Sequence, residues 1–331
     1  MSAAPLLHVR DLSVEFLTRR GTVKAVDRLS FTIQRGETLA LVGESGSGKS
    51  ASALALMGLI ALPGRVAGGS VHIDGVDLSS LSPRALEDLR GNRIAMVFQD
   101  PMSAMNPLLT IDTQLDEVLV RHTRLGRDAR RTRIVELLTQ VGIPKPLERL
   151  SRLPHEFSGG QRQRIMIAMA LACEPELLIA DEPTTALDVT IQAQILDLLA
   201  DLKARLGLAI LLVTHDLGVV AKVADRVAVM YAGRLVEVGD ADALYRAPAH
   251  PYTAGLLRAT PRLSDRLHRM VSIEGSPPDA RQLGAGCDFA PRCPLADAAC
   301  GARPPLATVD VAGRQAACVR PFHDAWGAAN G

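Results

Sequence analysis

An apolar run, a glycine-rich loop and a helix-forming segment follow one another directly near the start of the chain. Residues 39–42 (LALV) predict a short buried strand, GESGSGKS follows at 43–50, and residues 50–60 predict a helix. The loop fits G-x-x-x-x-G-K-[ST], a pattern in which glycines let backbone N–H groups converge on phosphate oxygens. This order constrains the chain to a strand–loop–helix unit of an α/β fold whose loop binds phosphate.

Two side chains of this loop have specific expected roles. Lys49 is placed to reach the β- and γ-phosphates of ATP, and the Ser50 hydroxyl is placed to ligate Mg²⁺. A glycine-rich turn that matches by chance is the alternative, and the strand and helix on either side make it the weaker interpretation. The other expected nucleotide contacts come from the loop and the residue after it: Gly43, Glu44, Ser45, Gly46, Ser47, Gly48 and Ala51.

An acidic pair closes a second apolar run. Asp181 and Glu182 follow residues 177–180 (LLIA), which predict a buried strand. Ligands of open α/β sheets gather at the carboxyl ends of strands. Asp181 is therefore expected to hold Mg²⁺ through water, and Glu182 to orient or deprotonate an attacking water. A simple helix cap is the alternative for such a pair.

A second glycine-containing run, FSGGQ at 157–161, precedes another predicted helix. Ser158, Gly159 and Gly160, with Gln161 after them, would offer a hydroxyl and open backbone amides at a helix N-terminus, which is an anion site. A plain loop with an N-cap is the alternative. One nucleotide site in one chain needs only one phosphate cradle, so the second run indicates a site completed by another copy of this module.

The remaining segments predict an α/β P-loop core with an N-terminal antiparallel β subdomain and an inserted helical lobe at about 100–160. The expected strands are 6–16, 25–33 and 210–213, the expected hairpins are 71–78 and 226–238, and the expected helix between core strands is 190–206.

Composition changes after residue 240. Prolines become frequent there, and four of the five cysteines lie beyond this point. We therefore expect a nucleotide-binding domain at 1–240 and a loop-rich C-terminal appendix at 241–331, held by something other than a large core.

The four tail cysteines, Cys287, Cys293, Cys300 and Cys318, are spaced C-x5-C-x6-C-x17-C. Persistent disulfides do not suit a cytosolic protein, so clustered thiols point to a metal. Structural zinc sites use shorter gaps, whereas four thiolates suit a [4Fe–4S] cluster. Zinc and metal-free thiols stay open as alternatives.

The charge balance and the hydrophobic pattern exclude several classes. The chain has 37 basic and 36 acidic residues, a net charge of +1, which gives no support for nucleic-acid binding. No apolar run approaches the ~18 residues of a membrane span. The N-terminus lacks the basic and apolar regions of a signal peptide. We expect a cytoplasmic chain that reaches a membrane only through partners.

Taken together, these motifs resemble those of the nucleotide-binding subunits of ABC transporters, in the order typical of that family. The resemblance implies that Gln99 is the Q-loop glutamine, which contributes to Mg²⁺ binding beside Ser50 and Asp181, and that Asp188 belongs to the D-loop. It also makes 157–161 the signature, Glu182 the catalytic glutamate and His215 the switch histidine, with Lys49 and Gln99 contributing to hydrolysis. Phe16 lies where the family stacks an aromatic ring on adenine.

Three further segments narrow the resemblance: QDPMSAMNPLLT (99–110), AHPYTAGLL (249–257) and GCDFAPRCPLADAAC (286–300). They resemble the D-type subunits of the oligopeptide, dipeptide and nickel importers. This resemblance implies an ATPase that powers peptide import from the cytoplasmic face of the cell membrane, and a [4Fe–4S] cluster in the tail. The implied partners are a second, paralogous ATPase subunit, two transmembrane permeases and an external substrate-binding protein.

Three alternatives remain at this stage. A nickel-chelate importer of the same family is one. A soluble ABC ATPase acting on DNA or ribosomes is disfavoured because the chain has a single module, no heptad run and no basic bias. The third is a regulatory appendix whose cysteines sense iron or redox state and gate the ATPase.

Overall fold

The computed structural model describes residues 4–185, 187–259 and 272–321. The chain divides into two compact units, one made of residues 1–6, 34–36 and 77–212 (unit 1) and the other of residues 7–33, 37–76 and 213–331 (unit 2). This division differs from the expected domains 1–240 and 241–331, which stay a prediction.

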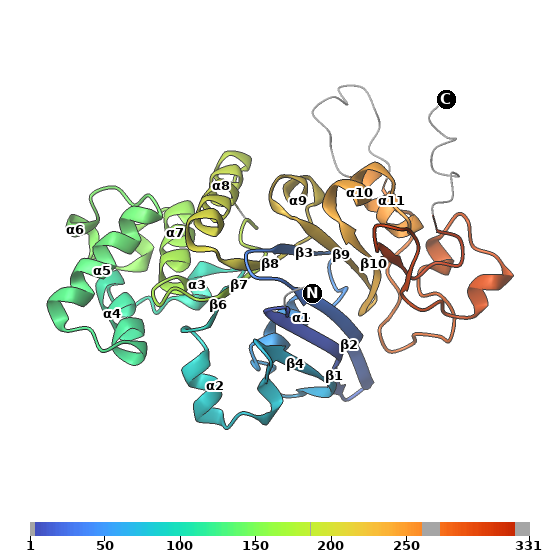
Figure 1. The fold of residues 1–331 in the computed structure, drawn as a ribbon, viewed down its shortest axis with the longest axis horizontal. Coiled ribbons are helices and arrows are strands. Elements are labelled where there is room, and N and C mark those ends of the chain that lie inside the picture. Colours follow the sequence, from blue (N-terminus) through green and yellow to red (C-terminus); the bar gives the residue numbers. More distant parts are fainter. Residues whose placement is uncertain (1–3, 186, 260–271, 322–331) are drawn as a thin grey trace. The chain divides into compact units, whose positions relative to one another are not determined.

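An antiparallel sheet opens unit 2. It contains β1 (Leu7–Thr18), β2 (Gly21–Ile33), β4 (Gly64–Ile73) and β5 (Val76–Asp77) in the order β2-β1-β4-β5. Strands β1, β2 and β4 are labelled in Figure 1. The turn between β4 and β5 has positive φ at both Asp74 (50°) and Gly75 (80°), as two-residue hairpins prefer. The expected N-terminal β subdomain and its hairpin are confirmed.

The second sheet of unit 2 carries the glycine-rich loop. Its β3 (Thr38–Val42) is buried at every position and pairs in parallel with β9 (Arg226–Tyr231). The expected hairpin follows, with β10 (Arg234–Asp240) antiparallel to β9 and positive φ at Ala232 and Gly233 in the turn. Two short strands of the tail, β12 (Gln315–Ala316) and β11 (Ala307–Thr308), extend this sheet beyond β10.

The helices of unit 2 depart from expectation in two places. Helix α1 (Lys49–Leu56) ends four residues before position 60, because Gly58 adopts a φ of 62° that suits a helix end. The segment after residue 240 is not loop at its start: α10 (Ala241–Arg246) and α11 (Pro251–Ala259) are helical, like α9 (Leu217–Val223) before them. Pro251 occupies the first helical position, where proline is tolerated.

Aromatic and aliphatic side chains fix this part of the chain in the core of unit 2. Leu244, Tyr252 and Leu257 belong to one buried cluster with Val227 and Val229. Phe289, only 1% exposed, joins the same cluster from the tail. The described tail, 272–321, otherwise holds only short 3₁₀ turns (Ala290–Arg292 and Ala298–Gly301) and the two short strands, as a loop-rich segment should.

Unit 1 contains a parallel strand pair and the helical lobe. Strands β6 (Ile94–Val97) and β7 (Leu177–Asp181) pair in parallel, with Val97 opposite Ala180. The expected lobe is present as α3 (Pro101–Ala104), α4 (Ile111–His122), α5 (Arg127–Gln140), α6 (Pro146–Arg149) and α7 (Gly159–Ala170) (Figure 1).

The expected helix at 190–206 is α8 (Val189–Leu206), and the expected strand at 210–213 is β8 (Ala209–Thr214), where the chain passes from unit 1 to unit 2. Helix α2 (Pro83–Leu89) and β6 had no counterpart in the sequence interpretation.

No helix within the described ranges is both long enough and apolar enough to cross a membrane.

Candidate functional site

The glycine-rich loop turns tightly between β3 and α1 because several of its positions admit no side chain. A Cβ on Gly43 would lie 2.2 Å from the Met230 carbonyl oxygen, and one on Gly48 would lie 2.1 Å from the Ala25 carbonyl oxygen. Both glycines also have positive φ, 157° and 102°. The neighbouring backbones of β2 and β9 therefore require glycine here, and the loop is a cradle of open backbone groups.

Lys49 and Ser47 lie inside this cradle. Both are buried, at 5% and 4% exposure. Lys49 Nζ donates hydrogen bonds to the carbonyl oxygens of Gly43 (2.8 Å) and Glu44 (3.0 Å), so the loop curls around its own ammonium group. Ser47 Oγ is buried and, within the described part of the chain, has no hydrogen-bond partner. A cationic, glycine-lined cradle with a spare hydroxyl suits a phosphate chain.

Glu44 is the acidic residue of the loop, and residues from beyond position 240 hold it. Its backbone N–H donates to the hydroxyl of Tyr252 at 2.9 Å. Its carboxylate forms a two-point ion pair with Arg292, whose Nη1 and Nη2 lie 2.6 and 3.0 Å from the two oxygens. Neither partner was identified from the sequence, although both lie in segments that carried the narrower resemblance.

Phe16 lies on β1, opposite Val23 of β2 and Gly64 of β4. Its ring is half-buried, and a Cβ on Gly64 would lie 2.6 Å from Phe16 Cε1. The Phe16 ring therefore packs against Gly64, where a side chain would clash with it.

The acidic pair and Gln99 come together in unit 1. Asp181, 5% exposed, ends β7, and Gln99 follows the paired end of β6, so both lie at the carboxyl edge of parallel strands. Gln99 Nε2 donates to Glu182 Oε2 at 3.0 Å, and Thr185 Oγ1 donates to the same oxygen at 2.8 Å. Glu182 has a φ of 45°, a strained conformation of the kind that clusters at functional sites.

The signature segment starts helix α7, also in unit 1. Ser158 caps that helix: its Oγ accepts from Gln161 N (3.4 Å), while Gln161 Oε1 accepts from Ser158 N (3.3 Å). A Cβ on Gly160 would lie 2.8 Å from Ile191 Cγ2, so glycine allows α7 to approach the start of α8. Asp188 caps α8 by accepting from Ile191 N at 2.9 Å. Both the signature and the D-loop aspartate therefore serve as helix caps here, which was the structural alternative for the signature.

The remaining motif residues lie at a strand end, in the loop and at the start of α1. His215 is exposed immediately after β8. Ala51 lies within α1, and Ser45 and Gly46 are exposed at the tip of the loop. Ala186, which the resemblance to ABC transporter subunits also places in the D-loop, two residues before Asp188, lies outside the described residues.

The four tail cysteines surround one small apolar cavity of about 20 Å³, together with Phe289, Leu295 and Val319. Burial raises the pKa of Cys287, Cys293 and Cys318, and the nearby thiols raise it further. Among the residues the structure describes, no group of three or more His, Cys, Asp or Glu side chains is arranged to hold a single metal ion. The thiols thus share a cavity without converging on one point.

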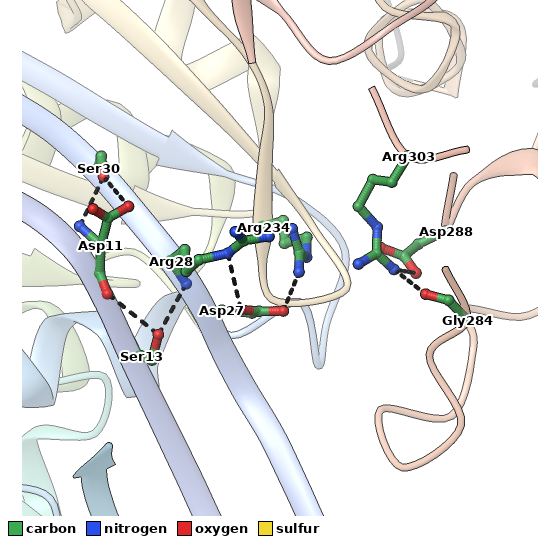
Figure 2. Close-up of polar contacts among 9 residues, drawn as sticks. All are labelled: Asp11, Ser13, Asp27, Arg28, Ser30, Arg234, Gly284, Asp288 and Arg303. Carbon is green, nitrogen blue, oxygen red and sulfur yellow. Dashed lines mark hydrogen bonds and ion pairs between the residues drawn. The ribbon is translucent and has the colours of Figure 1, made fainter. Parts of the chain in front are cut away.

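A larger cavity of about 390 Å³ in unit 2 shares the lining residues His250, Cys287 and Phe289 with this small one. Figure 2 shows the charged side chains around it: Arg234 points to Asp27, while Arg303 points to Asp288 and to the Gly284 carbonyl. Every acidic group drawn there faces a guanidinium or a hydroxyl. The charges of this cavity are mutually compensated, so it presents no single sign of charge to a ligand.

The glycine cradle after a core strand, the strand-end acidic pair and the capped signature helix define an ATP-binding cassette protein. The chain matches the family profiles "ABC transporter" over residues 26–185 and "Oligopeptide/dipeptide transporter, C-terminal region" over residues 236–300. It belongs to the family of ATP-binding subunits of oligopeptide and dipeptide ABC transporters.

Curated relatives match almost the whole chain. The oligopeptide transport ATP-binding protein OppD of Salmonella typhimurium is 50% identical over 319 residues, covering 96% of this chain and 95% of that protein. The dipeptide transport ATP-binding protein DppD of Escherichia coli is 48% identical over 320 residues, covering 97% and 98%. The family resemblance inferred from the motifs is confirmed.

Solved structures support the fold. The ATP-binding cassette MJ0796, in a dimeric post-hydrolysis state bound to ADP and Pi, superposes with a TM-score of 0.64 at 28% identity, covering 71% of this chain and 98% of that one. CbiO1 of Clostridium perfringens, part of the ABC transporter complex cbiONQ, gives 0.63 at 29% identity and covers 74% and 92%. The expected α/β P-loop fold of ABC type is confirmed.

Proposed function

We propose that this chain hydrolyses ATP to power the import of dipeptides or oligopeptides through an ABC transporter. The observation that carries the proposal is the complete set of phosphate-binding and hydrolytic groups on a chain about half identical to peptide-transport ATPases along nearly its full length. Substrate choice would rest with the permeases and the binding protein, since the peptide itself does not meet the nucleotide site.

The loop and the acidic pair have complementary roles in this proposal. Lys49 and the amides of the loop bind the β- and γ-phosphates, with Phe16 against the adenine. Glu182 acts as general base toward the attacking water, and its hydrogen bonds from Gln99 and Thr185 orient the carboxylate. His215 contacts the γ-phosphate. Mg²⁺ would be held by Ser50, Asp181 and Gln99 and would neutralise charge on the phosphates.

The second half of the site comes from a second subunit. Ser158, Gly159 and Gly160 lie at the N-terminus of α7, where open amides and the helix dipole favour an anion. In a head-to-tail dimer this end would meet the γ-phosphate bound by the partner's loop, with Gln161 and Asp188 beside it. The solved cassette MJ0796 is dimeric, which supports this assembly; here the partner would be a paralogous ATPase subunit.

The assembly places the chain at the cytoplasmic face of the cell membrane. Two transmembrane permeases would receive the conformational change through the helical lobe, and an external substrate-binding protein would deliver peptide. No nucleic-acid role is proposed, because basic and acidic residues balance at 37 and 36.

The direct test is peptide transport by the reconstituted complex with Glu182→Gln in this subunit. Glutamine still accepts the Gln99 and Thr185 hydrogen bonds, so ATP binding should persist while hydrolysis falls by ~10²–10⁴-fold. Lys49→Ala should instead weaken ATP binding itself. Normal transport by the Glu182→Gln complex, with the paralogue's site also disabled, would contradict the proposal.

We further propose that Cys287, Cys293, Cys300 and Cys318 hold a [4Fe–4S] cluster, with zinc as the alternative. Support comes from the cavity that all four thiols share. A cluster binds thiolates at separate irons, which suits thiols that surround a cavity instead of a point.

Anaerobic purification with iron, sulfide and zinc assays tests this part independently of ATP hydrolysis. About four irons per chain with broad absorbance near ~400 nm would support the cluster. One zinc per chain, or no metal, would overturn it and leave the ATPase proposal intact.

A further inference from the structure

Arg292 of the tail is fastened to the phosphate loop by a part-buried, two-point ion pair. Its side chain is 4% exposed and that of Glu44 is 27% exposed, and both terminal nitrogens contact the Glu44 carboxylate, at 2.6 and 3.0 Å. The hydroxyl of Tyr252, on α11, accepts from the Glu44 N–H at 2.9 Å. One loop residue is therefore held at its backbone and at its side chain by the C-terminal part of the chain.

Groups other than Glu44 also hold the Arg292 guanidinium in place. Its Nε donates to the Glu274 carbonyl at 3.0 Å, and Nη2 donates to the Ile273 carbonyl at 3.3 Å. It lies over the ring of Tyr231, 5.9 Å from the ring centre. The hydrogen bond to Glu44 raises the pKa of Arg292, which keeps the charge in place. A guanidinium with so many fixed partners loses little further freedom on pairing.

The consequence concerns the charge of the loop. Glu44 is the acidic residue in GESGSGKS (43–50), and an unpaired carboxylate at this position would repel a polyphosphate anion. Bidentate pairing with Arg292 neutralises that charge and turns the carboxylate toward the tail.

We propose that Arg292 is a positioning residue for ATP binding, which acts by neutralising and orienting Glu44 of the phosphate loop from the tail. This inference rests on the proposed function of the loop. It gives the C-terminal segment a direct part in the ATPase cycle, since nucleotide binding and the Arg292–Glu44 pair are then thermodynamically coupled.

A purely structural fastening of the tail is the competing explanation, and the tail offers a matched control. Arg303 also forms an ion pair with Asp288, at 2.6 Å, and donates to the Gly284 carbonyl oxygen at 2.6 Å (Figure 2). It donates as well to the carbonyl oxygen of Gly286, at 3.1 Å. None of these three partners belongs to the phosphate loop. Arg303→Gln thus removes a similar tail fastening without changing the charge next to the loop.

The experiment measures KM and kcat for ATP in the assembled transporter. Arg292→Gln should raise the KM for ATP by roughly tenfold, because Glu44 is left unneutralised, with kcat within about twofold of wild type. The KM of Arg292→Lys should lie between those of wild type and Arg292→Gln, since lysine keeps the positive charge but cannot form the two-point pair of a guanidinium. Adding Glu44→Gln to Arg292→Gln should bring the KM back toward wild type, because no carboxylate remains.

The outcomes separate the two proposals. If Lys49→Ala leaves ATP affinity and hydrolysis unchanged, the proposed function fails. If Lys49→Ala abolishes activity while Arg292→Gln and Arg303→Gln change the KM equally, or the double variant shows no recovery, the role of Arg292 is overturned and the pair is only a fastening. A lower melting temperature shared by both arginine variants, without a difference in KM, would overturn that role in the same way.

Discussion

Gln99 donates its amide hydrogen bond to Glu182 across 3.0 Å, from the end of one parallel strand to the end of its neighbour. The acceptor oxygen, Oε2, receives a second bond from Thr185 at 2.8 Å. The proposed general base is therefore oriented by two donors, one from the end of the neighbouring strand and one from the turn that follows its own strand.

Removing either donor should slow hydrolysis without unfolding the chain. Gln99→Leu and Thr185→Val each delete one hydrogen bond to a charged acceptor, worth about 1.5–3 kcal/mol. The expected loss in kcat is on the order of tenfold or more for each variant. Gln99 is exposed, so the melting temperature of Gln99→Leu should stay near that of wild type. An increased kcat would mean that these bonds restrain Glu182 from the attacking water.

The loop glycines should differ sharply in their tolerance of a methyl group. A Cβ on Gly46 meets nothing within 4 Å, whereas one on Gly48 lies 2.1 Å from a backbone oxygen. Gly46→Ala should cost only the ~1–2 kcal/mol of a left-handed residue. Gly48→Ala must also displace β2, so its melting temperature and ATP affinity should both fall well below those of Gly46→Ala. Equal melting temperatures would contradict the steric account.

The phosphate loop was predictable from sequence because its determinants are local. Strand, loop and helix follow within 39–60, and the three glycines of the loop share a positive φ that the turn itself imposes. The same holds for the hairpin turns at Asp74 and Ala232, whose positive φ is followed by glycine.

The ion pair between Arg292 and Glu44 was not predictable by the same means. Arg292 lies 248 residues from Glu44 in the chain, and no periodicity relates the two. The helices after residue 240 were missed for a different reason: the prolines there suggested loops. Pro251 instead starts α11, and the helices are packed by buried Leu244 of α10 and Tyr252 of α11. Burial of these side chains in the core outweighed the loop tendency that the prolines indicate.

Acidification should destabilise unit 2 through His250. Burial lowers the pKa of this imidazole to about 4, from 6.5 in the unfolded chain. The neutral ring therefore contributes stability that is fully present above pH 6.5 and is lost as the pH falls toward 4. The shift corresponds to about 3 kcal/mol in the free energy of unfolding.

Urea unfolding at about pH 7 and about pH 4.5 measures this effect. His250→Asn keeps an acceptor for the Tyr252 N–H, which His250 Nδ1 binds at 3.0 Å, but does not titrate, so its pH profile should be flatter. Buried Glu237, which faces Arg314 at 4.0 Å, has a raised pKa and gains stability on protonation. Glu237→Gln should accordingly make the free energy of unfolding fall more steeply as the pH is lowered. If the pH dependence of unfolding in His250→Asn equals that of wild type, His250 is not the group responsible.

Ser158 allows the two interpretations of the signature to be separated. As an N-cap its Oγ accepts from Gln161 N, and Asn or Asp would cap α7 equally well. As a part of the anion site, it must stay uncharged to meet a phosphate. Ser158→Asn and Ser158→Asp should therefore have similar melting temperatures, with free energies of unfolding within about 1 kcal/mol of wild type. Only Ser158→Asp should lose ATPase activity, by about a hundredfold, because it places a carboxylate beside the γ-phosphate.

Thr110 provides the control for charge alone, because its Oγ1 caps α4 by accepting from Thr113 N at 3.3 Å. Thr110→Asp adds the same charge at a helix N-terminus outside the signature, so steady-state ATPase activity should be retained. Equal activity in Ser158→Asn and Ser158→Asp would reduce Ser158 to a cap and remove the second anion site from the proposed dimer. Loss of activity in Thr110→Asp as well would trace the effect to helix N-terminal charge in general, since both variants keep a capping oxygen.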